Sequence, residues 1–197
     1  MKGSKADIIA QLQRDILPLQ GIKTASKNTA LDAGIGPLKN AFPNASFPLG
    51  AIHEFISTNI EDATATSGFV AGLISSIMQS NGALIWISAS RTIFPPALKS
   101  FGIPPDKIIF IDLQKEKEIM WVMEEALKCK GLSAVICEMQ ELNFTASRRL
   151  QLAVEQSRVT GFILRSNPRS INTTACVTRW QITSAKSELP EGMPGVG

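Results

Sequence analysis

The stretch from Phe47 to Met78 most restricts the fold, because its residue pattern changes once from strand to helix. A short apolar run at Ala51–Ile56 predicts a buried strand. After a tight turn, small and apolar residues predict a buried helix over Asp62–Met78. Nucleotide-binding proteins use this order of strand, turn and helix N-terminus to hold phosphate. The stretch therefore predicts an α/β domain whose first turn has the position of an anion site.

The turn itself lacks the residues that a phosphate loop needs, since it contains neither glycine nor lysine. Thr58 and Glu61 instead have the spacing of a capping box, in which two side chains satisfy the first free N–H groups of the helix. Glu61 and Asp62 also place negative charge there, and each carboxylate within ~6 Å would repel a polyphosphate by roughly 1–3 kcal/mol. We therefore predict a nucleotide-binding architecture whose anion site is filled by the chain's own side chains.

Strands and helices alternate along the rest of the chain, which predicts a parallel α/β sheet with right-handed crossovers and helices on both faces. Ligands of such sheets bind at the carboxyl ends of the strands. The further predicted strands are Ala83–Ser88, Ile108–Asp112, Ala134–Cys137, Gly161–Leu164 and Thr174–Thr183. The further predicted helices are Lys5–Leu17, Glu116–Cys129, Thr145–Arg158 (capped by Thr145) and a short one from Pro95 that Gly102 closes.

Composition limits the organisation and the function classes. The 197 residues suffice for one full core, and we expect a helical N-terminal segment and connector (1–46), an α/β domain (47–186) and a flexible tail (187–197). A net charge of +3 does not by itself indicate a nucleic-acid partner. Three scattered cysteines and one histidine lack metal-ligand spacing, so no metal and no cofactor is predicted, and a cytoplasmic location is expected. The uncharged stretch Ala63–Ser90 is broken at its middle, which favours burial over a membrane span.

Four motifs occur in order between Pro37 and Ser184: Phe47–Glu54, Glu116–Glu118 with Trp121 and Glu124–Leu127, Thr145–Ala153, and Thr178–Trp180. Together they resemble the ImuA/SulA family, a RecA-like group of bacterial SOS-response proteins. The resemblance implies a RecA-like core. It also implies one of two roles: ImuA-like proteins assist mutagenic translesion synthesis beside a Y-family polymerase-like partner, and SulA-like proteins block cell division by binding FtsZ.

An ungapped alignment with RecA-like proteins, anchored on Glu54, indicates which residues stand at the positions of their ATP site. The Walker lysine position falls at about Ala63, the preceding glycine at Asp62, and the catalytic glutamate near Ser90, whereas an acidic residue is kept as Glu138. The comparison therefore implies a degenerate nucleotide site without ATP hydrolysis. Its residues would be Thr58, Glu61, Asp62, Ala63, Thr64, Ser90 and Glu138.

Basic residues gather late in the chain, where the stretch from Glu141 to Lys186 holds six arginines. Arginine suits bidentate contact with phosphate or carboxylate, so this stretch is a candidate surface for DNA or a protein partner. Local pairing with Glu141 and Glu155 on a solvated helix face remains an equal alternative for the first two arginines. The candidate contact residues are Arg148, Arg149, Arg165, Arg169 and Arg179.

The remaining histidine and aromatic residues give no catalytic pattern. His53 has no nucleophile motif near it, so a structural histidine is expected. Trp86, Trp121 and Trp180 have apolar neighbours and are expected to pack in the core or against a partner. With no tyrosine and an aromatic content of 6%, a platform that stacks single-stranded bases is not favoured.

The sequence therefore predicts a RecA-like α/β domain without enzymatic activity, which acts as an accessory protein in SOS-induced error-prone DNA repair. Its expected partner is a Y-family polymerase-like or RecA-like protein, with DNA contact left open and the oligomeric state undetermined. The first alternative is a SulA-like division inhibitor, which an apolar patch near Thr145 or Phe94 would favour. The second alternative is an ATPase with a divergent phosphate loop.

Overall fold

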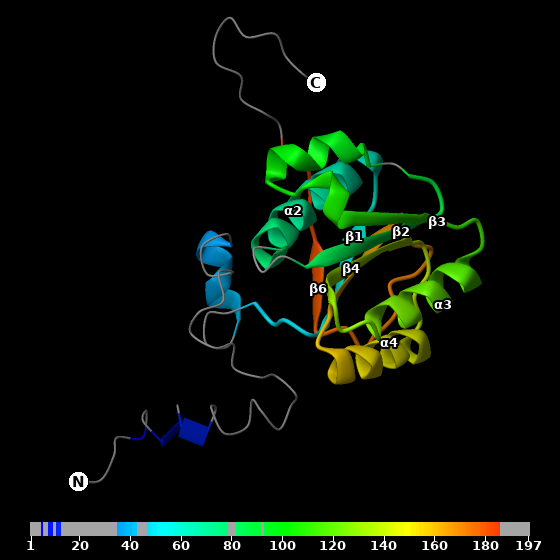
Figure 1. The fold of residues 1–197 in the computed structure, drawn as a ribbon. Coiled ribbons are helices and arrows are strands. Elements are labelled where there is room, and N and C mark those ends of the chain that lie inside the picture. The colour runs from blue at the N-terminus through cyan, green and yellow to red at the C-terminus, as the bar shows by residue number, and fades with distance from the viewer. Residues whose placement is uncertain are drawn as a thin grey trace, which may run out of the picture.

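The computed structural model describes residues 5, 8, 9, 11–12, 35–42, 47–78, 82–91 and 93–185. Their centre is one six-stranded sheet of order β3-β2-β4-β5-β1-β6, in which every pair of neighbouring strands is parallel (Figure 1). The strands are β1 (Ile52–Ser57), β2 (Ala83–Ser88), β3 (Ile108–Asp112), β4 (Leu132–Met139), β5 (Thr160–Ser166) and β6 (Thr178–Gln181). The helices are α2 (Ile60–Ile77), α3 (Glu116–Leu127) and α4 (Phe144–Ser157), with 3-10 helices η2 (Gly36–Ala41), η5 (Pro95–Phe101) and η6 (Pro105–Lys107).

Helices cover both faces of the sheet, as the alternating pattern predicts (Figure 1). On one face α2 buries Val70 and Ile74 against Phe55, Trp86 and other apolar side chains of the sheet. On the opposite face α3 and α4 form a second apolar cluster with the strands. Because both faces are covered, the central strands are apolar on both sides and read as continuous runs rather than alternating ones.

Strand β1 lies between β5 and β6 and is buried along its whole length. Its Phe55 stacks on Trp180 of β6 with ring centroids 6.0 Å apart. His53 packs on the Phe47 ring at 4.3 Å, and both of its ring nitrogens have partners. His53 Nε2 donates to the Pro48 carbonyl at 2.8 Å, and Nδ1 accepts from the Thr178 hydroxyl at 2.8 Å. The expectation of a satisfied structural histidine is confirmed.

The strands at Ala83–Ser88 and Ile108–Asp112 are confirmed residue for residue, and the other predicted elements occur with shifted ends. The last strand is the largest shift, because only Thr178–Gln181 pairs with β1. The short helix from Pro95 is a 3-10 helix, and Gly102 ends it in the left-handed conformation at φ 78°. None of the described helices is both long and apolar enough to cross a membrane.

The two predicted helix caps are wrong by one or two residues. Helix α2 is capped by Asn59, whose side chain accepts a hydrogen bond from the Asp62 N–H, and not by a Thr58–Glu61 box. Helix α4 is capped by Asn143, which accepts from the Ala146 N–H, and not by Thr145. The physical reason is the same in both cases, because asparagine is at least as good an N-cap as threonine.

The terminal segments are described only in part. Of the predicted helix Lys5–Leu17, residues 5, 8, 9, 11 and 12 are described, and these are helical. The rest of that helix, most of the predicted connector and the tail at 187–197 lie outside the described residues. Ile35 joins the core cluster on the α2 face, so part of the 1–46 segment packs on the α/β domain.

We predict that His53 makes the protein sensitive to mild acid. Burial lowers the pKa of His53 from 6.5 to about 3, although the hydrogen bond to the Pro48 carbonyl acts in the opposite direction. Between these two pKa values the unfolded chain binds a proton that the folded chain does not, so stability is complete above pH 6.5 and declines below it. The free energy of unfolding should fall by about 2 kcal/mol between pH 7 and pH 5 from this group alone.

Urea denaturation at the two pH values measures this effect. The His53→Gln variant keeps a polar side chain but cannot be protonated, so its free energy of unfolding should vary less over the same interval. An equal loss in the variant and in the wild type would show that another group is responsible.

Candidate functional site

The turn between β1 and α2 consists only of Thr58 and Asn59, so no loop is available to surround a phosphate. The carboxylate of Asp62 fills the space at the helix start. It accepts hydrogen bonds from the Thr58 hydroxyl at 3.1 Å and the Asn59 amide at 2.9 Å, and from the Ser184 backbone N–H at 2.8 Å. The Ser184 N–H is the main cause that lowers the pKa of Asp62, so the carboxylate stays ionised. The helix start is therefore occupied by an anion that belongs to the chain.

The other residues of the predicted nucleotide site have separate contacts. Thr64 donates its hydroxyl to the Ile60 carbonyl, and the Ala63 N–H donates to the Asn59 carbonyl, so both serve the first turn of α2. Glu61 and Ser90 are exposed. Glu138 accepts a hydrogen bond from Trp86 Nε1 at 2.7 Å. The structure thus brings Thr58 and Asp62 into direct contact, and it gives Glu138 a partner in the core.

A buried ion cluster at β1 is the main feature that sequence reasoning missed. The Glu54 carboxylate is fully buried, and Arg165 Nη1 lies 2.7 Å from its Oε1 atom. Arg179 Nε, at 2.8 Å, and the Thr174 hydroxyl, at 2.9 Å, donate to its Oε2 atom. Two cations and a hydroxyl on one carboxylate leave it fully satisfied, which is the condition for burying such a charge.

This cluster corrects one predicted contact residue. The side chain of Arg165 has no exposed surface, so it does not lie on a surface for DNA or a partner. Besides Glu54 it donates to the backbone carbonyls of Gln140 and Ser170. The arginine therefore fixes the loops that follow β4 and β5. A single sequence gives no signal for this pairing, because the partners stand 111 residues apart.

The remaining candidate arginines are largely engaged within the chain. Arg148 lies 3.6 Å from Glu155, which is one of the pairings that the sequence left open, and Arg149 lies 2.5 Å from Glu124. Arg179 binds Glu54, although 37% of its side chain stays exposed. Arg169 is exposed, and its backbone N–H donates to Glu141 at 2.7 Å. Most of the candidate arginines between Glu141 and Lys186 are thus paired with carboxylates of the same chain.

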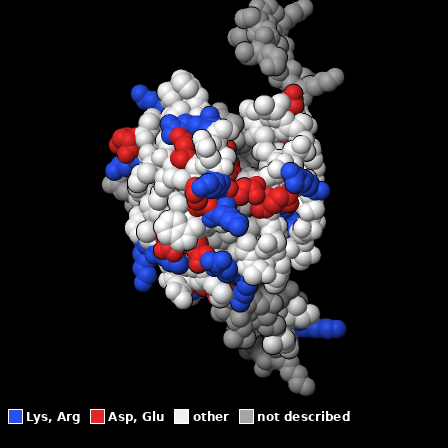
Figure 2. Space-filling model, turned by 90° about the vertical axis from the view of Figure 1, so that its right-hand side faces the viewer, with Lys and Arg blue, Asp and Glu red and all other residues white. Residues whose placement is uncertain are grey.

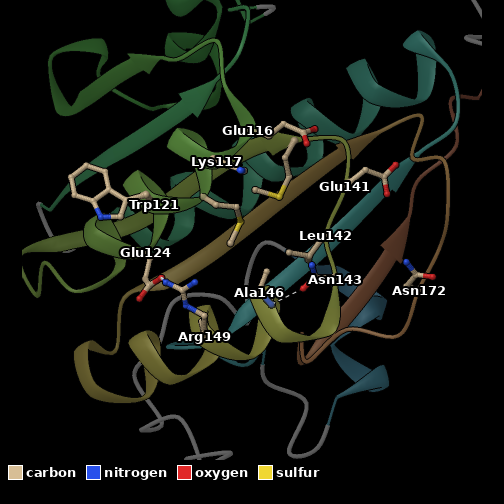
Figure 3. A pocket seen from close by; sticks show the side chains of 12 residues that line it. Glu116, Lys117, Trp121, Glu124, Glu141, Leu142, Asn143, Ala146, Arg149 and Asn172 are labelled. Carbon is tan, nitrogen blue, oxygen red and sulfur yellow. Dashed lines mark hydrogen bonds and ion pairs between the residues drawn. The ribbon is translucent and has the colours of Figure 1, made fainter.

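A groove of about 510 Å³ lies between the N-terminal halves of α3 and α4 (Figure 3). Its floor is apolar and continues the core cluster on this face through Met120, Met139, Leu142 and Ala146. Asn143 and Asn172 contribute amides, and Figure 3 shows the ion pair of Glu124 with Arg149 at one side. The remaining rim residues are Glu116, Lys117, Trp121 and Glu141.

Large apolar side chains stand exposed around this groove. Trp121 exposes 63% of its surface on α3, Phe144 exposes 55% at the start of α4, and Ile171 exposes 58% in the loop after β5. Figure 2 shows that acidic and basic residues are interleaved on the side of the molecule where β3 passes into α3. Among the described residues no group of three or more potential metal ligands is present. An apolar floor with an exposed indole and a mixed rim suits protein contact.

The fold and this groove together define a parallel α/β protein with a surface suited to association. The comparisons give the particular family. No family model matches the chain. Protein ImuA of Caulobacter vibrioides is 31% identical over 186 residues, which cover 88% of this chain and 76% of that protein. The chain therefore belongs to the ImuA family and has an SOS-associated role.

Relatives named SulA are more distant. Cell division inhibitor SulA of Photorhabdus laumondii is 29% identical over 96 residues, which cover 49% of this chain and 54% of that protein. The crystal structure of SulA from Pseudomonas aeruginosa has a TM-score of 0.50 at 14% identity, covering 58% of this chain and 97% of that chain. This structural likeness concerns the fold alone.

We predict that the buried ion cluster is essential for stability whereas the exposed pair is not. Replacing Arg165 by Met leaves Glu54 with an incompletely compensated buried charge, so the free energy of unfolding should fall by about 3–5 kcal/mol. Replacing Arg149 by Met breaks an exposed pair of the same residue types and should cost about 1 kcal/mol or less. Chemical denaturation of the two variants measures the difference, and equal losses would contradict the assignment.

Proposed function

We propose that this protein is a non-catalytic accessory protein of SOS-induced error-prone DNA repair, which acts by binding a Y-family polymerase-like or RecA-like protein. The observation that carries the proposal is the identity to Protein ImuA, 31% over 88% of the chain. The strand–turn–helix with its filled anion site gives independent support, because it agrees with a RecA-like core that has lost its Walker residues.

The first part of the proposal is that the protein has no enzymatic role. A triphosphate at the start of α2 would have to displace Asp62 from its bonds with Thr58, Asn59 and Ser184. It would then meet the carboxylate of Asp62 at the position of the glycine before the Walker lysine, and Ala63 at about the position of that lysine. Glu138, which a RecA-like enzyme would direct to a metal, is bonded to Trp86 instead. These contacts support a protein that uses the architecture without nucleotide chemistry.

The second step is the surface used for association. The groove is lined from α3 and α4, and these helices carry two of the motifs that resemble the ImuA/SulA family. Its methionines adapt to the shape of an inserted side chain, and tryptophan is among the residues that contribute most to interfaces. We place an apolar anchor residue of the polymerase-like partner over Met120 and Met139, with Trp121 beside it. The lysine and carboxylates of the rim would then set the orientation.

The same contacts bear on the DNA hypothesis. A phosphate backbone is bound by uncompensated cations, and counterion release then gives a steep dependence on salt. Arg148, Arg149 and Arg179 each have a carboxylate partner, and Arg165 is buried. The pairing favours a protein partner over direct DNA contact at these positions.

A second candidate function is inhibition of cell division through FtsZ. The relatives named cell division inhibitor SulA favour it. A specific surface feature also fits, because Phe94 exposes 68% of its surface before η5, away from the α3–α4 groove. This function predicts filamentous cells when the protein is overproduced, whereas the first predicts a change in mutagenesis.

We predict that ATP does not stabilise the protein. A ligand at a hundred times its dissociation constant would add about 2.7 kcal/mol to the free energy of unfolding, so binding would be evident as a higher melting temperature. Thermal unfolding with and without millimolar Mg-ATP should give the same midpoint. A higher midpoint with Mg-ATP, together with ATP hydrolysis that is lost in a Glu138→Gln variant, would instead identify a divergent ATPase.

We predict that Trp121→Ala reduces damage-induced mutagenesis by about fivefold or more, the loss expected for a tryptophan at the centre of an interface. The measurement is the frequency of ultraviolet-induced mutants in a strain that lacks the gene and carries the wild type or the variant. Phe94→Ala, which removes an equally exposed aromatic ring elsewhere, should complement fully. Filamentation that depends on Phe94, with unchanged mutagenesis, would favour the SulA-like function instead.

A further inference from the structure

Strands β3 and β6 are the two edges of the sheet (Figure 1). Strand β6 is four residues long, and its Arg179 folds back onto Glu54. Strand β3 reads Ile-Ile-Phe-Ile-Asp and has no charged residue before Asp112. Its second residue, Ile109, exposes 52% of its surface. An uncharged, apolar edge strand is a template for pairing with another strand.

The backbone groups that β3 turns outward follow from its pairing with β2. The Leu113 N–H donates to the Ser88 carbonyl at 2.9 Å, so this residue faces β2. The backbone N–H and C=O groups of successive residues point to opposite sides of a strand. Those of Ile111 and Ile109 therefore also point toward β2. The groups that face outward are therefore the N–H and C=O of Phe110 and Asp112 and the C=O of Ile108.

We infer that β3 is a self-association edge, at which two copies of this chain pair their β3 strands antiparallel and centred on Phe110. In this register Phe110 of each copy exchanges backbone hydrogen bonds with Phe110 of the second copy. Each Asp112 N–H meets the Ile108 carbonyl of the second copy. The Ile108 N–H is not needed, because it already donates to the Pro105 carbonyl. Sliding the strands in either direction shortens the overlap. This register therefore pairs the largest number of the backbone N–H and C=O groups that β3 turns outward.

The side chains are self-complementary in the same register. Ile109 stands opposite Ile111 of the second copy, on the sheet face that α3 covers, and the two-fold axis creates this apolar pair twice. The charged residue of β3, Asp112, stands opposite Ile108 of the second copy and is already paired with Arg91 of its own copy at 2.6 Å. This symmetry is why the occupant is a second copy rather than another protein.

Sedimentation equilibrium of the full chain over a range of concentrations tests the inference. The expected result is a dimer mass that dissociates on dilution. Ile109→Lys should raise the dimer dissociation constant by at least about tenfold, because the lysine enters the strand pairing twice. Ile171→Lys places the same change at an equally exposed isoleucine in the loop after β5, and should leave the constant unchanged. Circular dichroism and the urea midpoint establish that both variants are folded.

Cysteine cross-linking tests the register. In a Cys129→Ser background, Ile109→Cys combined with Ile111→Cys brings two thiols of different copies opposite each other, so mild oxidation should give a covalent dimer. A protein that stays monomeric at every concentration, or a dimer that survives Ile109→Lys, would overturn the inference. Trp121→Ala should not alter the dimer, so failure of the groove proposal and failure of this one are distinguishable.

Discussion

The buried carboxylate of Glu54 holds together the loops at the carboxyl ends of the strands. It lies on β1, and its partners Arg165 and Arg179 come from the two strands that flank β1. Both arginines also donate to backbone carbonyls in the loops around them, at Gln140, Ser170 and Asn172. Since Glu141 and Asn172 line the α3–α4 groove, the ion cluster links the core of the sheet to the shape of the groove.

Local patterns were enough to predict the strands, because a buried parallel strand is apolar along its length and its signal lies within a few consecutive residues. The caps failed by a residue or two, since Asn59 stands beside Thr58 and both are acceptable N-caps. The burial of Arg165 and the groove could not be predicted in this way. Each depends on residues that only the fold brings together, and an arginine destined for a buried pair looks like any other in sequence.

The prediction that the chain's own carboxylates fill the anion site rested on the acidic residues at the start of α2. The structure keeps a carboxylate there but changes which residue caps the helix. The sequence placed the carboxylates of Glu61 and Asp62 at the helix N-terminus, with Glu61 in a capping box, whereas in the structure Asn59 caps the helix and Asp62 holds the side chains of Thr58 and Asn59. Either carboxylate interacts favourably with the positive end of the helix dipole. Asp62 gains more, because it also binds Ser184 and so ties the chain after β6 to the first helix.

The two proposed surfaces are geometrically compatible. Antiparallel pairing of β3 reverses the strand direction between copies, so the carboxyl ends of the two sheets point in opposite directions. The groove lies at the carboxyl side, between the starts of α3 and α4, and is therefore carried to opposite ends of the pair. Neither groove is covered by the strand pairing, and each remains open to a partner. A dimer of this kind would present two equivalent grooves, so partners that are themselves held close together would bind it with avidity as well as affinity.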